Sequence, residues 1–323
     1  MNETWSFLLN RLITTLLIVL GAMLLLFLLT ALVPGDPATA LLGPQATPEY
    51  AHRFIVEMGL DQPWYRRLFT YLGHVATGDF GTDVISGRKV TSIVGAVLPY
   101  TFILTFAAIG LAVVTGVPLG CYAATHRGGA IDHALAFVSV AFIAIPSFVI
   151  AIFLLLIFST GLDWLPVLGA GDSGDLLDQA ERLILPTVAL SVGWVGFIAR
   201  LVRGSMLEVL NEPFIRTSRA YGLSTRQVIY KYALKNACIP VLAVLGLGVG
   251  RLLGGAVLVE IVFARPGLGR LILDAIATRD FPVLQGAVLV VVFIFVVANL
   301  LVDLSFSAID PRMRRQSRLR TAA

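Results

Sequence analysis

The sequence predicts an all-α membrane protein with six transmembrane helices and a long external loop after the first of them. Two observations support this fold class. Hydrophobic residues make up 57% of the 323 residues and charged residues only 14%, whereas a soluble domain carries about 25% charge. In addition, six segments reach the length of roughly 20 apolar residues that crosses a bilayer. A chain this apolar has no face to show to water, so the lipid bilayer is the solvent that fits it.

The six predicted spans cover residues 12–33, 99–122, 134–158, 183–201, 239–262 and 283–306. A cleaved signal peptide is the alternative for the first of them. However, its apolar run exceeds the roughly 7–15 residues of a signal h-region. Pro34-Gly35-Asp36-Pro37 follows it, and no small-x-small cleavage site stands out. We therefore expect a retained N-terminal anchor helix over residues 1–33.

The loops indicate how the chain is oriented, because cytoplasmic loops of membrane proteins carry an excess of Lys and Arg. Seven of the 24 basic residues lie within 200–235, and five lie in the tail after residue 311. The loop 159–181 has no Lys or Arg and is acidic, as expected outside. Both termini are therefore predicted to be cytoplasmic.

This orientation divides the chain into four parts. After the anchor, an external segment over 34–98 is predicted to hold helices near 48–58 and 64–76, followed by the turn-rich Gly78-Asp79-Phe80-Gly81. A five-helix core over 99–306 includes a cytoplasmic loop at 203–237. A basic cytoplasmic tail over 307–323 ends the chain.

The cytoplasmic loop predicts a short helix, a sharp turn and a second helix. Pro213 is tolerated in the first turn of a helix, and no breaker follows before Gly222. Gly222 stands where a left-handed residue ends a helix. Ser224 and Gln227 then have the spacing of a capping box that starts the next helix.

A helix of about nine residues is marginal in water by itself. The first helix of the loop therefore needs a surface to pack on, and Phe214, Ile215 and Tyr221 offer apolar anchors. A partner protein is the natural candidate for that surface.

The loop also resembles a known pattern. Arg216-Thr217-Ser218-Arg219-Ala220-Tyr221-Gly222 resembles the Glu-Ala-Ala-x-x-x-Gly loop of bacterial ATP-binding-cassette importer permeases. Its departures from that form look like the dipeptide/oligopeptide/nickel branch, whose loops read Arg-Thr-Ala-Arg-Ala-x-Gly. Segments similar to the same branch follow in order at 33–37, 59–63, 78–81, 145–148, 265–270, 280–286 and 310–312. The long external segment is typical of the first of the two permeases in such systems.

The resemblance implies the type I importer permease fold in a bacterial cell membrane. It implies a subunit that translocates di- or oligopeptides delivered by an extracytoplasmic binding protein. The implied partners are a second homologous permease and two ATPase subunits, separate or fused, which would use ATP and Mg²⁺; no cofactor is expected on this chain. In this family the short helix docks on the ATPase, so the expected coupling residues are Pro213, Phe214, Ile215, Arg216, Thr217, Ser218, Arg219, Ala220, Tyr221, Gly222 and Leu223.

Arg251 lies midway through the fifth predicted span, where a charge is costly and marks a functional site by default. It could line the translocation pathway and meet a peptide carboxylate. Alternatively, it could pair with a carbonyl group or with a carboxylate of the partner permease. Gly246, Gly250 and Gly254 recur every four residues on the same span. Small residues at this spacing let helices approach closely, so we expect helix packing there.

Enzymatic chemistry is not predicted. No Lys follows a Gly, so a phosphate-binding P-loop is missing and ATP hydrolysis must come from another subunit. The four His residues form no His-Glu-x-x-His motif, no metal site is expected, and the clustered basic residues favour membrane topology over nucleic-acid binding. The alternatives are a nickel, haem or glutathione permease of the same family, or a stand-alone secondary transporter. A secondary transporter would show inverted repeats or Gly/Pro-broken spans at matching positions, and neither is evident.

Overall fold

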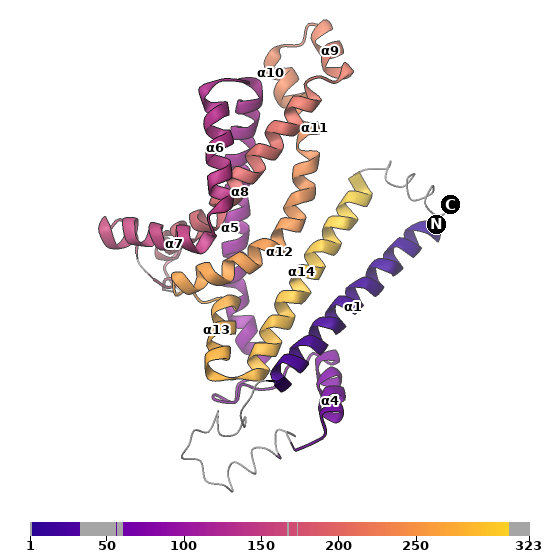
Figure 1. The fold of residues 1–323 in the computed structure, drawn as a ribbon, viewed down its shortest axis with the longest axis vertical. Helices are drawn as coiled ribbons and strands as arrows, with labels where there is room; N and C mark the ends of the chain where they lie inside the picture. The colour runs from indigo at the N-terminus through magenta and orange to yellow at the C-terminus, as the bar shows by residue number, and fades with distance from the viewer. Residues whose placement is uncertain (1, 33–55, 57–60, 167, 173, 310–323) are drawn as a thin grey trace. The chain divides into compact units, whose positions relative to one another are not determined.

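A computed structural model describes residues 2–32, 56, 61–166, 168–172 and 174–309 of the chain (Figure 1). The chain divides into two compact units. The first unit comprises Met1–Pro99 with Pro266–Val297, and the second comprises Tyr100–Arg265 with Ala298–Ala323. Among the described residues, five helices are long and apolar enough to cross a membrane, or six if one bent pair counts as a single span. This confirms the predicted helical membrane fold.

The following helices belong to the second unit. They are α5 (Val90–Thr125, whose first ten residues belong to the first unit), α6 (Ala130–Ala144), α7 (Ser147–Leu154), the π-helix η1 (Leu155–Gly161), α8 (Leu176–Val209), α9 (Pro213–Ala220), α10 (Thr225–Gln227), the π-helix η2 (Val228–Ala233), α11 (Leu234–Ala237) and α12 (Ile239–Val262). Helix α12 has the bounds that the sequence predicted, and residues 225–246 of the run leading into it are apolar enough to span.

Helix α8 is the centre of the second unit and contacts α6, α7, α11 and α12. It also packs closely on α5. A Cβ atom on Gly120 would lie only 2.4 Å from the carbonyl oxygen of Ala199, and one on Gly116 would lie 3.1 Å from Ile198. Two glycines four residues apart therefore let the α5 and α8 backbones approach each other, as small residues do in membrane helices.

The predicted packing stripe on the fifth span was partly wrong. Space beside Gly254 is open, because a Cβ there would meet nothing within 4 Å, whereas a Cβ on Gly248 would lie 2.4 Å from the Trp194 ring. Gly255 also faces α8, because a Cβ there would lie 3.3 Å from Leu190. Gly248 and Gly255 are seven residues apart, which is two helical turns, so they share one face of α12. Gly254 lies off that face and is exposed.

The third span is broken, which its continuous apolar sequence did not lead us to expect. Helix α6 ends at Ala144, and the axis bends by 98° before α7 and η1 continue the apolar run. Proline disfavours the helical region for the residue before it, and Ile145 accordingly adopts an extended backbone with ψ of 122° before Pro146. The expectation of one continuous helix over 134–158 is corrected.

The first unit contains α1 (Asn2–Leu32), α4 (Trp64–Ala76), α13 (Leu268–Thr278) and α14 (Phe281–Ile309, whose end belongs to the second unit). Its core joins the start of α5 to α13 and α14 through Val90, Val94, Leu268, Ala275, Val283 and Ala287. Helix α4 confirms the prediction of a helix over 64–76. The predicted helix near 48–58 falls, apart from residue 56, outside the described residues, and so does the tail after residue 309.

Candidate functional site

The cytoplasmic loop folds as the sequence predicted. Helix α9 begins with Pro213 in its first turn, after Glu212 in an extended conformation. It ends at Ala220, and Gly222, two residues later, has a φ of +75° in the left-handed region that glycine adopts without steric cost. The amide of Gly222 donates to the Arg219 carbonyl at 3.0 Å, and the amide of Leu223 donates to the Ser218 carbonyl at 3.3 Å. These two bonds make a Schellman motif, which satisfies the free carbonyls at the helix end.

The second helix of the loop starts with the predicted capping box. Ser224 Oγ accepts a hydrogen bond from the Gln227 amide at 3.4 Å, and Gln227 Oε1 accepts one from the Ser224 amide at 3.2 Å. The loop is therefore two helices joined by a tight turn whose backbone groups are satisfied on both sides. Such a unit can move as one rigid body, and we call residues 213–227 the lever.

Ile215 attaches this lever to the core of its own chain. Its side chain is fully buried in a cluster with Val202 and Met206 of α8 and with Val228 and Ala233 of η2. The expectation that Ile215 offers an anchor to a partner protein is therefore corrected, because α8 and η2 already cover it. An eight-residue helix gains its stability from this burial.

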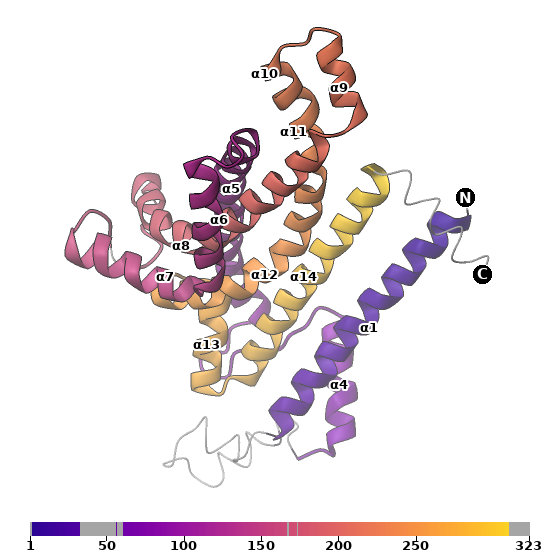
Figure 2. The same cartoon turned by 45° about the horizontal axis from the view of Figure 1, so that its top comes forward.

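Other residues of α9 are left exposed by the part of the chain that the structure describes. Tyr221 is 83% exposed and Phe214 39% exposed, and both stand among exposed arginines, Arg216 and Arg219. Thr217 and Ala220 are exposed as well, whereas Ser218 and Leu223 are half-buried. Figures 1 and 2 show α9 at one end of the second unit, joined to α10 by a tight turn. Its exposed residues include two aromatic rings and two positive charges.

An ion pair fastens the neighbouring cytoplasmic turn to α8. Asp132, in the first turn of α6, accepts two hydrogen bonds from the Arg203 guanidinium, one of them from Nη2 to Oδ2 at 2.9 Å. The same carboxylate accepts a hydrogen bond from the Gly128 amide at 3.0 Å. The α5–α6 turn is thereby tied to the helix that leads into the lever. Sequence reasoning missed this pair because 71 positions separate its members.

Arg251 lies on a face of α12 that none of the described residues covers. Its side chain is exposed, and so are Gly254 and Leu258, three and seven residues further along the helix. Residues at this spacing share one helix face. Leu252 and Leu253, by contrast, are buried against the core. Gly246 and Gly250 are half-buried.

A buried polar cluster lies at the C-terminal end of α12. The Thr101 hydroxyl donates to Glu260 Oε1 at 2.7 Å, and the Arg265 guanidinium lies 5.8 Å from the ring centroid of Tyr100. The Thr101, Glu260 and Arg265 side chains are at most 3% exposed. In the sequence, Arg265 stood out only as part of the segment 265–270, which resembles the importer permeases. No local sequence pattern indicates that an arginine in a loop will be buried.

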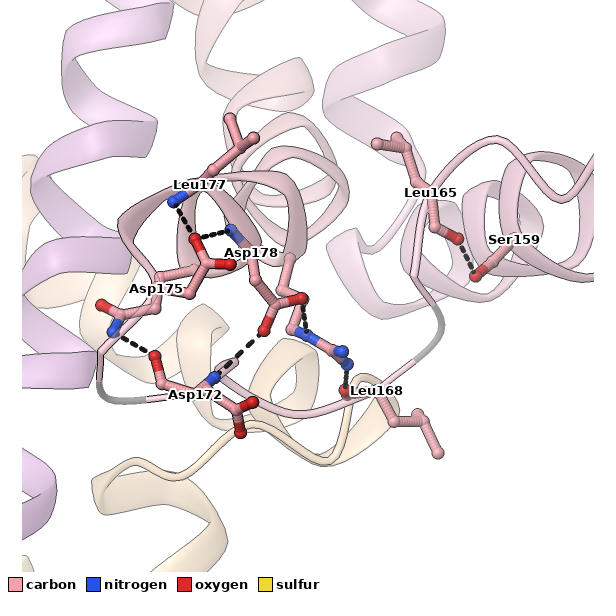
Figure 3. Close-up of polar contacts among 9 residues, drawn as sticks. Ser159, Leu165, Leu168, Asp172, Asp175, Leu177 and Asp178 are labelled. Carbon is pink, nitrogen blue, oxygen red and sulfur yellow. Dashed lines mark hydrogen bonds and ion pairs between the residues drawn. The ribbon is translucent and has the colours of Figure 1, made fainter.

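The acidic residues of the loop before α8 build that helix's N-terminus (Figure 3). Asp175 accepts hydrogen bonds from the amides of Leu177 and Asp178 at 2.9 and 3.2 Å, which makes it the N-cap. Asp178 accepts from the Asp172 amide at 3.0 Å and pairs with Arg182 at 2.8 Å. These carboxylates therefore serve the local fold.

Two segments that were predicted to be external contact each other in the first unit. They are residues 79–90 and 280–286, and we call them the outer clasp. A Cβ on Gly286 would lie 2.5 Å from Val90 and 3.3 Å from Phe80, so only glycine fits there. Asp280 is 3% exposed and accepts hydrogen bonds from the amides of Val84 and Val283 at 3.1 and 3.0 Å.

The clasp also brings two carboxyl groups together. Burial raises the pKa of Asp280 to about 6, and the hydrogen bond to the Asp83 carboxyl adds to this shift. Burial also raises the pKa of Asp83, but hydrogen bonds from Asp280, Ser86 and backbone amides outweigh it and lower that pKa to about 2. One proton is therefore shared between the two groups, with Asp83 holding the charge.

Comparison with known proteins places the chain in a family. The family described as binding-protein-dependent transport system inner membrane component matches residues 116–315, and the family of N-terminal regions of such membrane components matches residues 4–105. A probable peptide ABC transporter permease protein of Sinorhizobium fredii is 40% identical over 95% of this chain and 99% of the relative.

Two other relatives carry more specific names. The di/tripeptide transport system permease protein DppB of Pseudomonas aeruginosa is 37% identical over 96% of this chain and 99% of its own length. The glutathione transport system permease protein GsiC of Salmonella choleraesuis is 40% identical over 94% of this chain and 96% of its own length.

Among solved structures, the methionine ABC transporter MetNI in an inward-facing conformation is similar to this chain in fold. The match has a TM-score of 0.54 at 21% identity and covers 68% of this chain and 97% of that one. The family match and the relatives, which are membrane transport components, agree with the fold. The chain therefore belongs to the inner-membrane components of binding-protein-dependent transport systems, and it is an ABC importer permease of type I fold.

Proposed function

We propose that this chain is the membrane-spanning subunit of an ATP-driven importer of di- and oligopeptides, delivered by an extracytoplasmic binding protein. The observation that supports this most strongly is the α9 lever, which is anchored inside by Ile215 and uncovered outside at Phe214 and Tyr221. A helix with two exposed aromatic rings on its cytoplasmic face fits a groove on a partner. The ATPase subunits are the partner of an ABC permease that changes conformation when nucleotide binds. They hold the ATP and Mg²⁺.

The lever offers a direct mechanical route into the membrane. When ATP binding closes the two ATPases, their grooves carry α9 with them. Because Ile215 packs on Met206 of α8 and on Val228 of η2, the movement reaches two spans at once. Rigid elements that shift between two packed arrangements are a recognised route for such switching.

The uncovered face of α12 supports a second homologous permease as partner. A charge such as Arg251 is costly in lipid, so protein or water must cover the face that carries it. Either Arg251 lines the pathway and meets a peptide carboxylate, or it pairs with a group of the second permease. Measuring peptide uptake by the Arg251→Leu variant in an intact assembly separates these two roles. Unchanged transport would reject the pathway role.

Short peptides are the substrate class that the relatives' names favour. Those names refer to peptides, di- and tripeptides, and glutathione, and glutathione is itself a small peptide with free carboxylates. A glutathione permease is therefore the first alternative, and nickel or haem permeases of the same family are others. Both termini are proposed to lie in the cytoplasm, with the outer clasp and α4 on the opposite side.

The proposal is tested by placing a charge on the lever. Ala220→Glu should insert and assemble, yet uptake of a radiolabelled dipeptide by proteoliposomes should fall strongly while the ATPases remain able to hydrolyse ATP. Gln62→Glu adds the same charge to an exposed external residue and should leave uptake unchanged. Uptake at the wild-type rate by Ala220→Glu would argue against a coupling role for α9.

A further inference from the structure

Helix α4 has more apolar surface than the described residues of the first unit cover. Its inner face packs on α1, where Tyr71 and Phe27 stack with ring centroids 6.1 Å apart, and Leu68, Leu72 and Val75 are half-buried. Three large apolar residues remain outside this contact. Trp64, Tyr65 and Phe69 are 66%, 48% and 71% exposed.

Two of these residues form a flank, whereas Trp64 in the first turn lies on the face of Tyr71, seven residues further along. Tyr65 and Phe69 are four residues apart and therefore neighbours on the helix surface, beside the face that contacts α1. Arg66, Thr70 and His74 are also spaced by four and occupy the opposite side. The helix thus has an apolar arc wider than the contact with α1, and a polar arc that carries positive charge.

The contact with α1 sets the depth of α4 in the membrane. Phe27 lies five residues before the end of α1 at Leu32, which is roughly 8 Å along a helix. The apolar stretch of α1 ends at Thr30, and only 6% of it is buried. Tyr71, stacked on Phe27, therefore lies close to the level at which the acyl chains give way to headgroups.

We propose that α4 is an interfacial helix whose flank of Tyr65 and Phe69 lies in the headgroup–acyl boundary of the outer leaflet, with Trp64 at the start of the helix in the same boundary. Apolar side chains of α1 next to Phe27 are exposed as well, since Leu24 and Leu28 are 47% and 55% exposed. Trp and Tyr are enriched at that boundary because one end of each ring is apolar and the other polar. Arg66 extends from the flank's polar edge toward the phosphates.

This assignment gives α4 a mechanical role. A helix held both by α1 and by the lipid boundary fixes the level at which the external segment leaves the membrane. The role does not depend on which substrate crosses or on how ATP is used.

Two adjacent residues provide a matched test. Phe69 lies on the proposed lipid flank and Thr70 on the polar side, and both are exposed. Each is changed to Cys in a full-length chain carrying Cys121→Ser and Cys238→Ser. It is then spin-labelled in the assembled transporter in phosphatidylethanolamine–phosphatidylglycerol nanodiscs. Collision with oxygen reports lipid exposure, and collision with a nickel chelate reports water exposure.

The label at residue 69 should show a ratio of oxygen to nickel collisions several-fold higher than the label at residue 70. Tyr65→Cys, on the same flank, should repeat the result for residue 69 and guards against one poorly folded variant. Equal nickel access at 69 and 70 would show a flank in water, and protection from both reagents would show a protein on it. Either result overturns the proposal.

Discussion

Asp83 and Asp280 hydrogen-bond each other in the outer clasp, although one precedes the core spans and the other stands directly before the last one. Two carboxyl groups that hydrogen-bond each other would repel if both were ionised. The clasp therefore holds best when the pair retains one proton.

The outer clasp should be tightest near pH 4 and loosen as the pH rises. Asp280 has a pKa of about 6 against an ordinary 3.8, so its contribution is complete below pH 3.8 and is lost as the pH rises through 6. Asp83 has a pKa of about 2, so its contribution is lost as the pH falls from 3.8 toward 2. Amide hydrogen exchange over residues 79–90, corrected for intrinsic rate, should be faster at pH 7.5 than at pH 5.

Asp280→Asn should remove this pH dependence, because an amide cannot release the proton. Asp79→Asn changes a carboxyl group of the same segment outside the pair and should keep the dependence. Equal corrected exchange at both pH values in the wild-type chain would contradict the shared proton.

Gly222→Ala should weaken the lever, because an alanine in the left-handed region costs about 1 kcal/mol. Gly222→Asn should be milder, since asparagine tolerates that conformation. Gly222→Pro should be the most severe, because proline holds φ near −65° where the turn has +75°. The ratio of dipeptides taken up to ATP hydrolysed should fall in the order Asn, Ala, Pro. Equal ratios in all three would show that the turn geometry does not matter.

Gly120→Val should destabilise the core, because its side chain has no space against Ala199 and Val202. Overpacking of this kind costs about 1–3 kcal/mol, and the thermal midpoint of the purified chain should drop. Gly110→Val on the same helix is the control, since nothing lies within 4 Å of a Cβ there. Similar midpoints for the two variants would contradict the close α5–α8 contact.

Gly254→Leu and Gly248→Leu should separate packing within the chain from pairing between subunits. Gly248 lies against Trp194, so its replacement should lower the stability of the chain itself. Gly254 is exposed on the face of Arg251, so its replacement should leave the chain folded and reduce co-purification with the second permease. Normal pairing of the Gly254→Leu chain would place the partner on another face.

Local sequence signals predicted the lever and α4 well. A proline at the first turn, a glycine at the end and a Ser–Gln capping box each act within one helical turn, so Gly222 and Ser224 could be assigned without a fold. Helix α4 is likewise bounded by local breakers, Pro63 before it and Gly78 after it. The break at Pro146 was missed because the apolar run continues on both sides of it, although the proline itself was a signal.

Features made by distant residues could not be predicted. Asp83 meets Asp280, and Asp132 meets Arg203, only when spans far apart in the chain pack together. The same limit explains why the glycines at the closest helix contacts were not predicted. Spacing alone suggested Gly246, Gly250 and Gly254, whereas the closest approach depends on which face of α12 meets Trp194 and which face of α5 meets Ala199.

Photo-cross-linking from α9 tests most directly the claim that this lever couples the spans to an ATPase. A benzoylphenylalanine in place of Tyr221, which is 83% exposed, should form an adduct with the ATPase subunit in the assembled transporter. The same substitution at Tyr65 on α4 should form none. An assembled, transporting complex in which residue 221 gives no ATPase adduct would contradict the account.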